Sequence, residues 1–531
     1  MLKVLKKLKE SWVSVIAIVI LLAIQAAGDL TLPDYTSKIV NIGIQNGGIE
    51  NVAPEVIRKS EMENLLIFTE EDDKILSLYE EISKENLDNK EYEKLVKKYP
   101  ALENEALYKI KKVNKNEQNE LNSIMAKPLM IISMLENEET SEQMKEQMLE
   151  QITKNQEMQN TPISQNAQST QEEQIAQAKI KEQQIKAMQN MSLIEIIKQM
   201  PKEQLEKMLE NINQKINDMQ ESILEQAAIQ EVKNEYKAIG MDTNQIQNQY
   251  IIIAGLKMLG ISFIIMVSAI SIMCLSARVA ARLAKTLREK VFKKVLSFSN
   301  KEFSEYSTAS LITRSTNDIQ QIQGLIAILF RVLVYAPIIG IGGFLRVLRQ
   351  SDNSMAWIIG VAILAILFVV GTLFIIAMPR FKKLQQLIDK LNLVAREILT
   401  GLPVIRAFNT EKKEEKRFDT ANIELTKTNL FVNRAMSFMM PTLMLIMNGI
   451  SLLIVWVGAN GIDNGTMQVG NMMAFIQYTM QIVMSFLMIS MVSIMLPRAS
   501  VSANRINEIL ETDEKADTGK SMLNRMKTKF I

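Results

Sequence analysis

Three residues near the end of the chain, Gly519, Lys520 and Ser521, have the types and order found at the end of a phosphate-binding loop. The complete loop is G-x-x-x-x-G-K-[ST], entered from a buried strand, because its glycines let consecutive backbone N–H groups converge on a phosphate. Here Glu514 stands in the place of the first glycine, and the preceding ETDEKADT is too polar for a buried strand. The sequence therefore predicts that this stretch does not bind nucleotide.

The composition excludes most other side-chain chemistry. The 531 residues include no histidine and one cysteine, Cys274. A disulfide framework, a Cys/His zinc site and a Ser-His-Asp triad are therefore excluded. The formal net charge is +2, and no basic face with interleaved aromatic residues indicates nucleic-acid binding. We expect no catalytic residue and no metal site, so the remaining polar residues must be interpreted through the elements that carry them.

Six apolar stretches are long enough, at about 20 residues, to cross a bilayer as helices. They lie near residues 12–30, 251–275, 324–344, 356–378, 438–457 and 472–496. A cleaved signal peptide is the alternative for the first, because a Lys-rich start precedes its apolar centre and small residues follow at Ala26 to Gly28. The apolar pattern continues beyond that point, which favours a retained helix.

Basic residues gather before the first span and in two loops of unusual length, residues 276–322 and 381–429. Lys and Arg near the ends of spans stay on the cytoplasmic side, so we expect both termini inside. Arg346 and Arg349, between the third and fourth spans, oppose this rule. Valines and leucines at helical spacing (Val279, Leu283, Leu287, Val291 and Val295) predict that the first loop is helical, with its bases on a solvated face that attracts lipid head groups. Two antiparallel helices of about 25 residues would make an arm about 35 Å long.

Three segments carry a family resemblance. FSNKEFSEYSTASLITRSTNDIQQIQ (298–323) resembles the first intracellular loop of ABC exporters, and REILTGLPVIRAFNTEKKEEKRFDTAN (396–422) resembles the second. LPRASVSANRINEIL (496–510) resembles the segment that leaves their sixth helix. In this order, the segments make the chain similar to the transmembrane domain of a multidrug-type bacterial half-transporter, of the heterodimeric kind in which one subunit has a large external insertion.

The resemblance implies an all-α membrane protein, with six helices of the ABC exporter type 1 transmembrane fold, in a bacterial plasma membrane. In that family short coupling helices at the arm tips fit grooves of the ATP-binding domains; here they would lie near residues 299–304 and 399–407. The implied coupling residues are Phe303, Tyr306, Arg314, Asp318, Gly401, Arg406 and Phe408. Aromatic residues on polar tips are typical of interface cores. The alternative is that they pack within their own arm.

The chain departs from the family because no ATPase domain follows the sixth span in these residues. Whether the chain is an enzyme is therefore left open. We expect ATP and Mg²⁺ to bind a missing or partner domain, and the tail MLNRMKTKFI favours truncation. The implied partners are a second half-transporter, in a heterodimer, together with nucleotide-binding domains and the bilayer. The expected divisions are residues 1–49, 50–248, 249–510 and 511–531.

Residues 50–248 form the expected extracellular helical insertion. Thr69 followed by EEDDKILSLYEEI predicts a capped helix, and the periodic Leu205, Met208, Ile212, Ile216, Met219 and Ile223 predict a helical hairpin or coiled-coil seam. The Gln/Asn-rich stretch 151–177 is interpreted as a linker. The insertion is either a lid or docking cap over an external gate, or a tolerated addition.

Polar and methionine side chains within the last two spans mark a candidate substrate cavity: Asn448, Gln477, Tyr478, Gln481, Met484 and Met488. Polar groups inside a bilayer are costly and usually face an interior, and methionine suits varied apolar molecules. Ordinary packing between helices explains the same residues equally well. We expect export of a lipophilic drug, lipid or peptide by alternating access. The alternative is a transport-inactive sensing or binding protein that works through its extracellular domain.

Overall fold

The structure, a computed structural model, describes residues 11–137, 192–298, 306–349 and 355–512, except 199, 201 and 218, together with residues 141, 142 and 145. The chain divides into two compact units. The long-helix unit comprises Met1–Thr36, Lys257–Asn460 and Met472–Ile531, and the head unit comprises Ser37–Leu256 and Gly461–Asn471.

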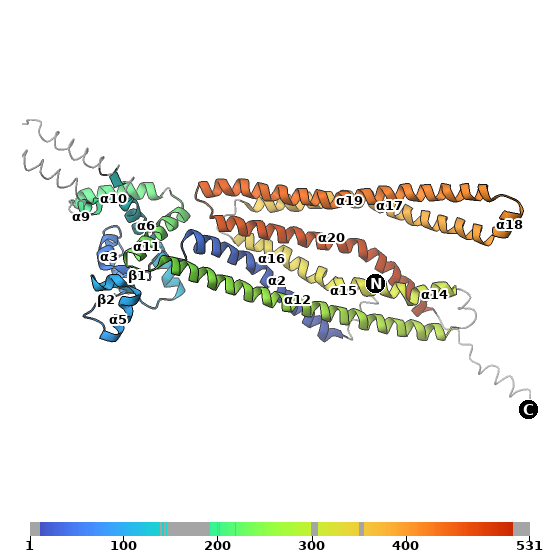
Figure 1. Ribbon diagram of the computed structural model, residues 1–531, viewed down its shortest axis with the longest axis horizontal. Coiled ribbons are helices and arrows are strands. Elements are labelled where there is room, and N and C mark those ends of the chain that lie inside the picture. The colour runs from blue at the N-terminus through green and yellow to red at the C-terminus, as the bar shows by residue number, and fades with distance from the viewer. Residues whose placement is uncertain are drawn as a thin grey trace, which may run out of the picture. The chain divides into compact units, whose positions relative to one another are not determined.

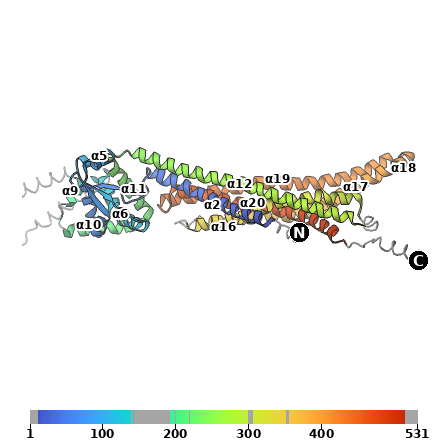
Figure 2. The ribbon, with the colours of Figure 1, turned by 90° about the horizontal axis from the view of Figure 1, so that it is seen from below.

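Long helices dominate the first of these units (Figure 1). In chain order they are α2 (Trp12–Lys38), α12 (Thr243–Leu296), α14 (Thr308–Ser315), α15 (Asn317–Phe330), α16 (Ala336–Arg349), α17 (Ala356–Thr400), α18 (Leu402–Ala407), α19 (Glu411–Asp463) and α20 (Val469–Glu511). Two π-helical turns interrupt this pattern: η2 (Ile39–Gln45) extends α2, and η4 (Arg331–Tyr335) joins α15 to α16. Helices α17 and α19 run side by side in Figures 1 and 2, and ion pairs such as Lys390–Glu424 join them.

Six helices in the described part of the chain are long and apolar enough to cross a membrane: Trp12–Gln45, Thr243–Leu296, Thr308–Arg349, Ala356–Thr400, Glu411–Asp463 and Val469–Ile489. Their number and places agree with the six predicted spans, and the prediction of an all-α membrane protein is confirmed. Helix α2 continues past Gly28 to Lys38.

Both long loops are mainly helical over the residues that the structure describes, as predicted. Helix α17 has 45 residues, which makes it about 68 Å long, more than twice the roughly 30 Å of a hydrocarbon core. Helix α12 buries the predicted apolar face, since Val279, Leu283 and Leu287 are at most 5% exposed. These side chains pack with Ile506 and Ile509 of α20 in one core cluster.

The head unit is mainly helical and also contains a sheet that the sequence analysis did not predict. Strands β1 (Val56–Arg58), β3 (Leu107–Ile110) and β2 (Tyr79–Ile82) pair in that order, and both pairings are antiparallel. The helix expected after Thr69 is therefore wrong at both ends: α4 (Asp72–Leu78) has Glu71, without a side-chain cap, at its N-cap position, and it ends where YEEI begins β2. Tyr79 is 3% exposed, and burial on a pleated surface outweighs the helix preference of the two glutamates.

Helices surround this sheet. They are α3 (Lys59–Leu66), α5 (Asn89–Lys98), η3 (Pro100–Glu103), α6 (Lys115–Glu136), α9 (Leu193–Lys198), α10 (Lys202–Asn217) and α11 (Glu221–Ala238). A complete capping box starts α6, because Asn114 accepts the Glu117 N–H and Glu117 accepts the Asn114 N–H. The periodic residues 205–223 form two helices, α10 and α11, not one continuous seam. The predicted linker 151–177 lies outside the described residues.

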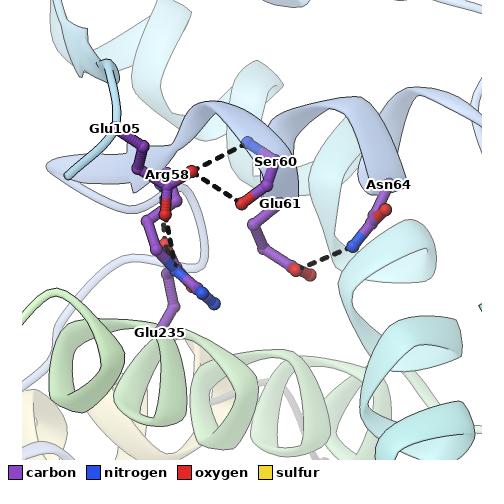
Figure 3. Close-up of polar contacts among 6 residues, drawn as sticks. All are labelled: Arg58, Ser60, Glu61, Asn64, Glu105 and Glu235. Carbon is purple, nitrogen blue, oxygen red and sulfur yellow. Dashed lines mark hydrogen bonds and ion pairs between the residues drawn. The ribbon is translucent and has the colours of Figure 1, made fainter. Parts of the chain in front are cut away.

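One buried ion pair joins the sheet to α11 (Figure 3). Arg58 Nη2 and Nε donate to Glu235 Oε2 at 2.6 and 3.0 Å, and the Arg58 backbone N–H donates to Glu235 Oε1 at 2.7 Å. Glu235 is 2% exposed. These hydrogen bonds raise the pKa of Arg58. The pair fixes the end of β1 against α11.

Candidate coupling and substrate sites

The first arm tip holds its predicted residues against the end of α20. The Tyr306 hydroxyl lies 3.1 Å from Thr512 Oγ1, and the Tyr306 ring stacks on Phe298 with centroids 5.9 Å apart. The Arg314 guanidinium lies 5.1 Å from the centre of the Tyr306 ring. Phe303 and the predicted coupling helix at 299–304 lie outside the described residues.

Arg314 and Asp318 tie the same region to α20 more firmly. Arg314 Nη1 donates to the Arg505 carbonyl and to Glu508 Oε2, both at 2.9 Å. Ser502 Oγ donates to Asp318 Oδ1 at 2.8 Å, and Asp318 is 4% exposed. Both residues therefore hold two segments of this chain together, which is the arrangement that packing within the arm predicts.

The second arm tip is different. Helix α17 ends at Thr400, Gly401 forms the corner, and α18 begins at Leu402, within the predicted 399–407. A short helix with Pro403 in its first turn fits this corner, because proline needs no N–H partner there. Arg406 is exposed, and Phe408 is 76% exposed. Gly401, Arg406 and Phe408 thus lie together at one tip, in contrast to Tyr306, Arg314 and Asp318 at the other.

Asn409 gives the second tip its shape. Its φ of +53° is a left-handed conformation, in which asparagine is tolerated better than most residues. The Thr410 N–H donates to the Ile405 carbonyl at 3.0 Å, and the Asn409 N–H donates to the Arg406 carbonyl at 3.3 Å. This pair of bonds is a Schellman motif. It ends α18 and leaves Phe408 at the turn into α19.

The predicted cavity residues do not share one environment. Tyr478 is 1% exposed, and its hydroxyl donates to the Leu30 carbonyl at 3.1 Å and to Asp34 Oδ1. Gln481 lies on the same side of α20 as Tyr478, against α2. Gln477 and Met488 are half-buried, Met484 is 47% exposed, and Asn448 is exposed on α19. Tyr478 and Gln481 are therefore brought together, and Asn448 is not joined to them by any contact among the described residues.

Pro33 explains the position of Gln481. Proline has no backbone N–H, so the Asp29 carbonyl, four residues earlier in α2, loses its helical partner. Gln481 Nε2 donates to that carbonyl at 2.9 Å. A side chain of α20 therefore completes the backbone bonding of α2.

Sequence reasoning did not single out Asp29 and Asp34, two acidic residues of α2. Together with the side chains that bind them (Tyr335, Arg346, Tyr478 and Gln481), they form what we call the polar layer around Asp29. Asp34 Oδ2 accepts from Arg346 Nη1 at 2.5 Å, and Asp29 Oδ2 accepts from the Tyr335 hydroxyl at 2.6 Å. The signal was present, since an ionisable residue within an apolar span indicates a functional or pairing role. Arg346, which opposed the charge rule, thus has a structural role as the partner of Asp34.

No group of three or more Asp, Glu or Cys side chains in the described ranges is arranged to hold a metal ion. Gly519, Lys520 and Ser521 lie outside those ranges. The two arm tips and the polar layer around Asp29 are thus the candidate functional regions that the structure describes.

Comparison with known proteins identifies the family. The profile described as the ABC transporter transmembrane region matches residues 205–486, more than half of the chain. An uncharacterized ABC transporter ATP-binding protein of Mycobacterium tuberculosis is 38% identical over 262 residues, which cover 49% of this chain and 44% of that protein. Another, of Bacillus subtilis, is 31% identical over 265 residues, covering 50% and 46%.

A third relative has a named substrate. The ATP-dependent lipid A-core flippase of Pseudomonas aeruginosa is 27% identical over 251 residues, covering 46% of this chain and 40% of the flippase. The chain thus spans less than half the length of each of these relatives. The profile match, together with six membrane-crossing helices and two helical arms, shows that this chain belongs to the ABC transporter transmembrane region family.

Proposed function

We propose that this chain is a transmembrane subunit of an ATP-driven exporter that moves an amphiphilic molecule by alternating access. ATP and Mg²⁺ would bind nucleotide-binding domains, either on a further part of the same protein or on a partner. The relatives named as ATP-binding proteins support this arrangement. In the proposed orientation both termini and both arm tips face the cytoplasm of a bacterium, and the head unit faces outwards.

The exposure of α18 is the observation on which the proposal mainly rests. Leu399, Val404 and Phe408 are 73%, 60% and 76% exposed at the end of a polar arm. Apolar side chains gathered on a surface mark an interaction site, and aromatic anchors carry much of the binding energy at such sites. A nucleotide-binding domain that receives α18 would cover them, and movement of that domain would be transmitted along α17 and α19.

The assembly would contain a second half-transporter. Bases of the second arm are partly paired between α17 and α19, as in Arg417 Nη2 to Glu397 Oε2 at 2.5 Å. We propose a heterodimer with a complete ATPase partner as the working form.

Phe408→Asp tests the proposal. The chain is purified with its nucleotide-binding partner in lipid nanodiscs, and ATPase activity is measured with and without an amphiphilic substrate. A charge in a buried aromatic pocket should lower the stimulated activity at least about tenfold, since truncated hot spots cost about 2 kcal/mol or more. Phe408→Leu is the matched control, because it keeps an apolar anchor and should retain most stimulation. Equal stimulation in Phe408→Asp and the unmodified chain would contradict the coupling role of α18.

A further inference from the structure

Two carboxylates of α2 lie in different surroundings. Asp34 pairs with Arg346 at 2.5 Å and accepts the Tyr478 hydroxyl. Asp29 accepts the Tyr335 hydroxyl at 2.6 Å, and within the described chain no Lys or Arg nitrogen lies within 4.0 Å of its carboxylate. A carboxylate in a membrane-spanning helix is costly and normally has a cationic partner. Among the described residues, Asp34 has such a partner and Asp29 does not.

Two more buried oxygen atoms, on side chains that lie near Tyr335 or the Asp29 backbone, lack hydrogen-bond partners among the described residues. They are Oε1 of Gln25 and Oε1 of Gln481, both buried. Gln25 is 5% exposed, lies one turn before Asp29 on the same face of α2, and has its side chain near Tyr335. Gln481 uses its Nε2 on the Asp29 carbonyl, so its oxygen is the atom left over. The cluster therefore has unused acceptors.

The wall of this cluster is a π-helical turn. Tyr335 is the last residue of η4, and such turns recur at functional sites because they change the direction in which side chains project. The Arg331 guanidinium lies 6.0 Å from the centre of the Tyr335 ring. The Arg331 guanidinium is thus a cation near this ring, and the face of an aromatic ring attracts cations.

Asp29 lies at membrane depth. It follows Trp12 by 17 residues, about 26 Å along the helix, and Trp12 is 63% exposed, as expected of a residue at the bilayer surface. That distance places Asp29 toward the far side of a hydrocarbon core about 30 Å thick. A ligand that reaches it must have an apolar part as well as a positive charge.

We propose that Asp29, Gln25 and Gln481 bind the protonated primary amine of an amphiphilic molecule. An ammonium group has three N–H donors and no acceptor, which matches one carboxylate and two amide oxygens. Sodium is the competing occupant, because carboxylate and amide oxygens also suit a hard cation. The inference rests on the proposed function, because it names the chemical class of the transported molecule.

The test is direct binding of radiolabelled octylammonium to the purified chain in lipid nanodiscs, with empty nanodiscs as the blank. Asp29→Asn should weaken binding about tenfold or more, because hydrogen bonds to a charged partner are the strong ones. Gln25→Leu should weaken it severalfold. Asp34→Asn is the matched control and should change affinity less than twofold, since Asp34 is already paired with Arg346. Octyltrimethylammonium, which has the charge and no N–H donor, should bind at least tenfold more weakly.

Three outcomes would overturn the inference: unchanged affinity in Asp29→Asn, equal binding of octyltrimethylammonium, or displacement of octylammonium by sodium chloride at the same concentration. Circular dichroism and gel filtration check that each variant is folded. If Asp29→Asn fails to fold, two measurements still test the inference. They are octylammonium binding to Asp29→Glu, and the comparison of octylammonium with octyltrimethylammonium. The binding measurement needs no ATPase partner. A negative result at the amine site would therefore leave the coupling role of Phe408 unaffected, and a negative result for Phe408 would leave the amine site unaffected.

Discussion

The head unit and the second arm tip use large side chains in opposite ways. Tyr99, Leu65 and Ile57 of the head unit are fully buried in one core cluster. At the second arm tip Phe408, Leu399 and Val404 point out of their own chain. The head unit completes its apolar contacts within the described residues, whereas the tip leaves them open.

Charged groups show the same difference. Glu235 of the head unit is buried and receives four hydrogen bonds from Arg58, while the arm pairs between α17 and α19 lie at the surface. Breaking a buried ion pair lowers the free energy of unfolding strongly, whereas an exposed pair contributes little to it. We infer that the head unit is built for stability and the second tip for contact with a partner. The first tip lies between these extremes, because its polar residues bind α20.

Breaking the buried pair should have the largest effect. Glu235→Ala leaves the Arg58 guanidinium and the Arg58 N–H without their main acceptor, which should cost the head unit about 3–5 kcal/mol. Hydrogen exchange of the β3 amides in the purified chain should then accelerate more than a hundredfold, since every 1.4 kcal/mol is a factor of ten.

The matched control for this variant is Glu81→Ala. Glu81 pairs with Lys59 at 3.0 Å on the surface of the same sheet, so its loss should leave β3 exchange unchanged. Comparable acceleration in both variants would mean that the buried pair stabilises the head unit no more than a surface pair does, and the contrast between buried and exposed charges would disappear.

The second prediction concerns pH. Glu61 and Glu231 are 4% and 2% exposed, and each has an oxygen without a partner among the described residues. Burial, with the nearby Glu136 carboxylate, raises the pKa of both to about 7 from an ordinary value of 4.5. Figure 3 shows Glu61 reaching Asn64, whose Nδ2 donates at 3.0 Å. Because the folded head unit holds protons that the unfolded chain releases, its stability should fall as pH rises from 4.5 to 7.

The expected loss is about 3 kcal/mol per group across that range, with little further change above pH 7. Hydrogen exchange, corrected at each pH for the intrinsic rate, measures it. Glu231→Gln should flatten the slope, because an amide cannot ionise. The charged groups that face this cluster are Arg58, Glu105, Glu136 and Glu235. If stability instead increased between pH 5 and 7, the effect of Arg58 would outweigh that of the carboxylates.

The long-helix unit was largely predictable because its signals are local. Apolar runs of sufficient length give the six spans, the period of Val279 to Val291 gives the buried face of α12, and Gly401 with Pro403 marks the corner before α18. Each of these features depends on residues close together in the sequence. The coupling and cavity roles of individual side chains remain predictions.

The sheet and the polar layer around Asp29 could not be predicted from local signals, because the residues that contact one another there lie far apart in the sequence. Strand β1 is only three residues long and pairs Arg58 with Leu107, and β2 has the helix-forming glutamates of YEEI. Pro33 indicates a free carbonyl at Asp29, yet nothing local identifies Gln481 as its partner, 452 residues away. Tertiary contacts decided both cases against local preference.

The smallest expected effect separates the two arm tips. Arg314→Ala removes the bonds to the Arg505 carbonyl and Glu508, so α14 amides should exchange about fivefold faster, the equivalent of about 1 kcal/mol. Arg406→Ala at the exposed tip should leave exchange of α18 unchanged in the purified chain and lower substrate-stimulated ATPase activity only when the nucleotide-binding partner is present. If Arg406→Ala instead loosens α18 in the chain alone, that tip is held by its own arm as the first tip is, and the exposure of Phe408 no longer argues for a partner. If Arg314→Ala changes coupling without changing exchange, the first tip also acts through an external contact, and its bonds to α20 serve to orient that contact.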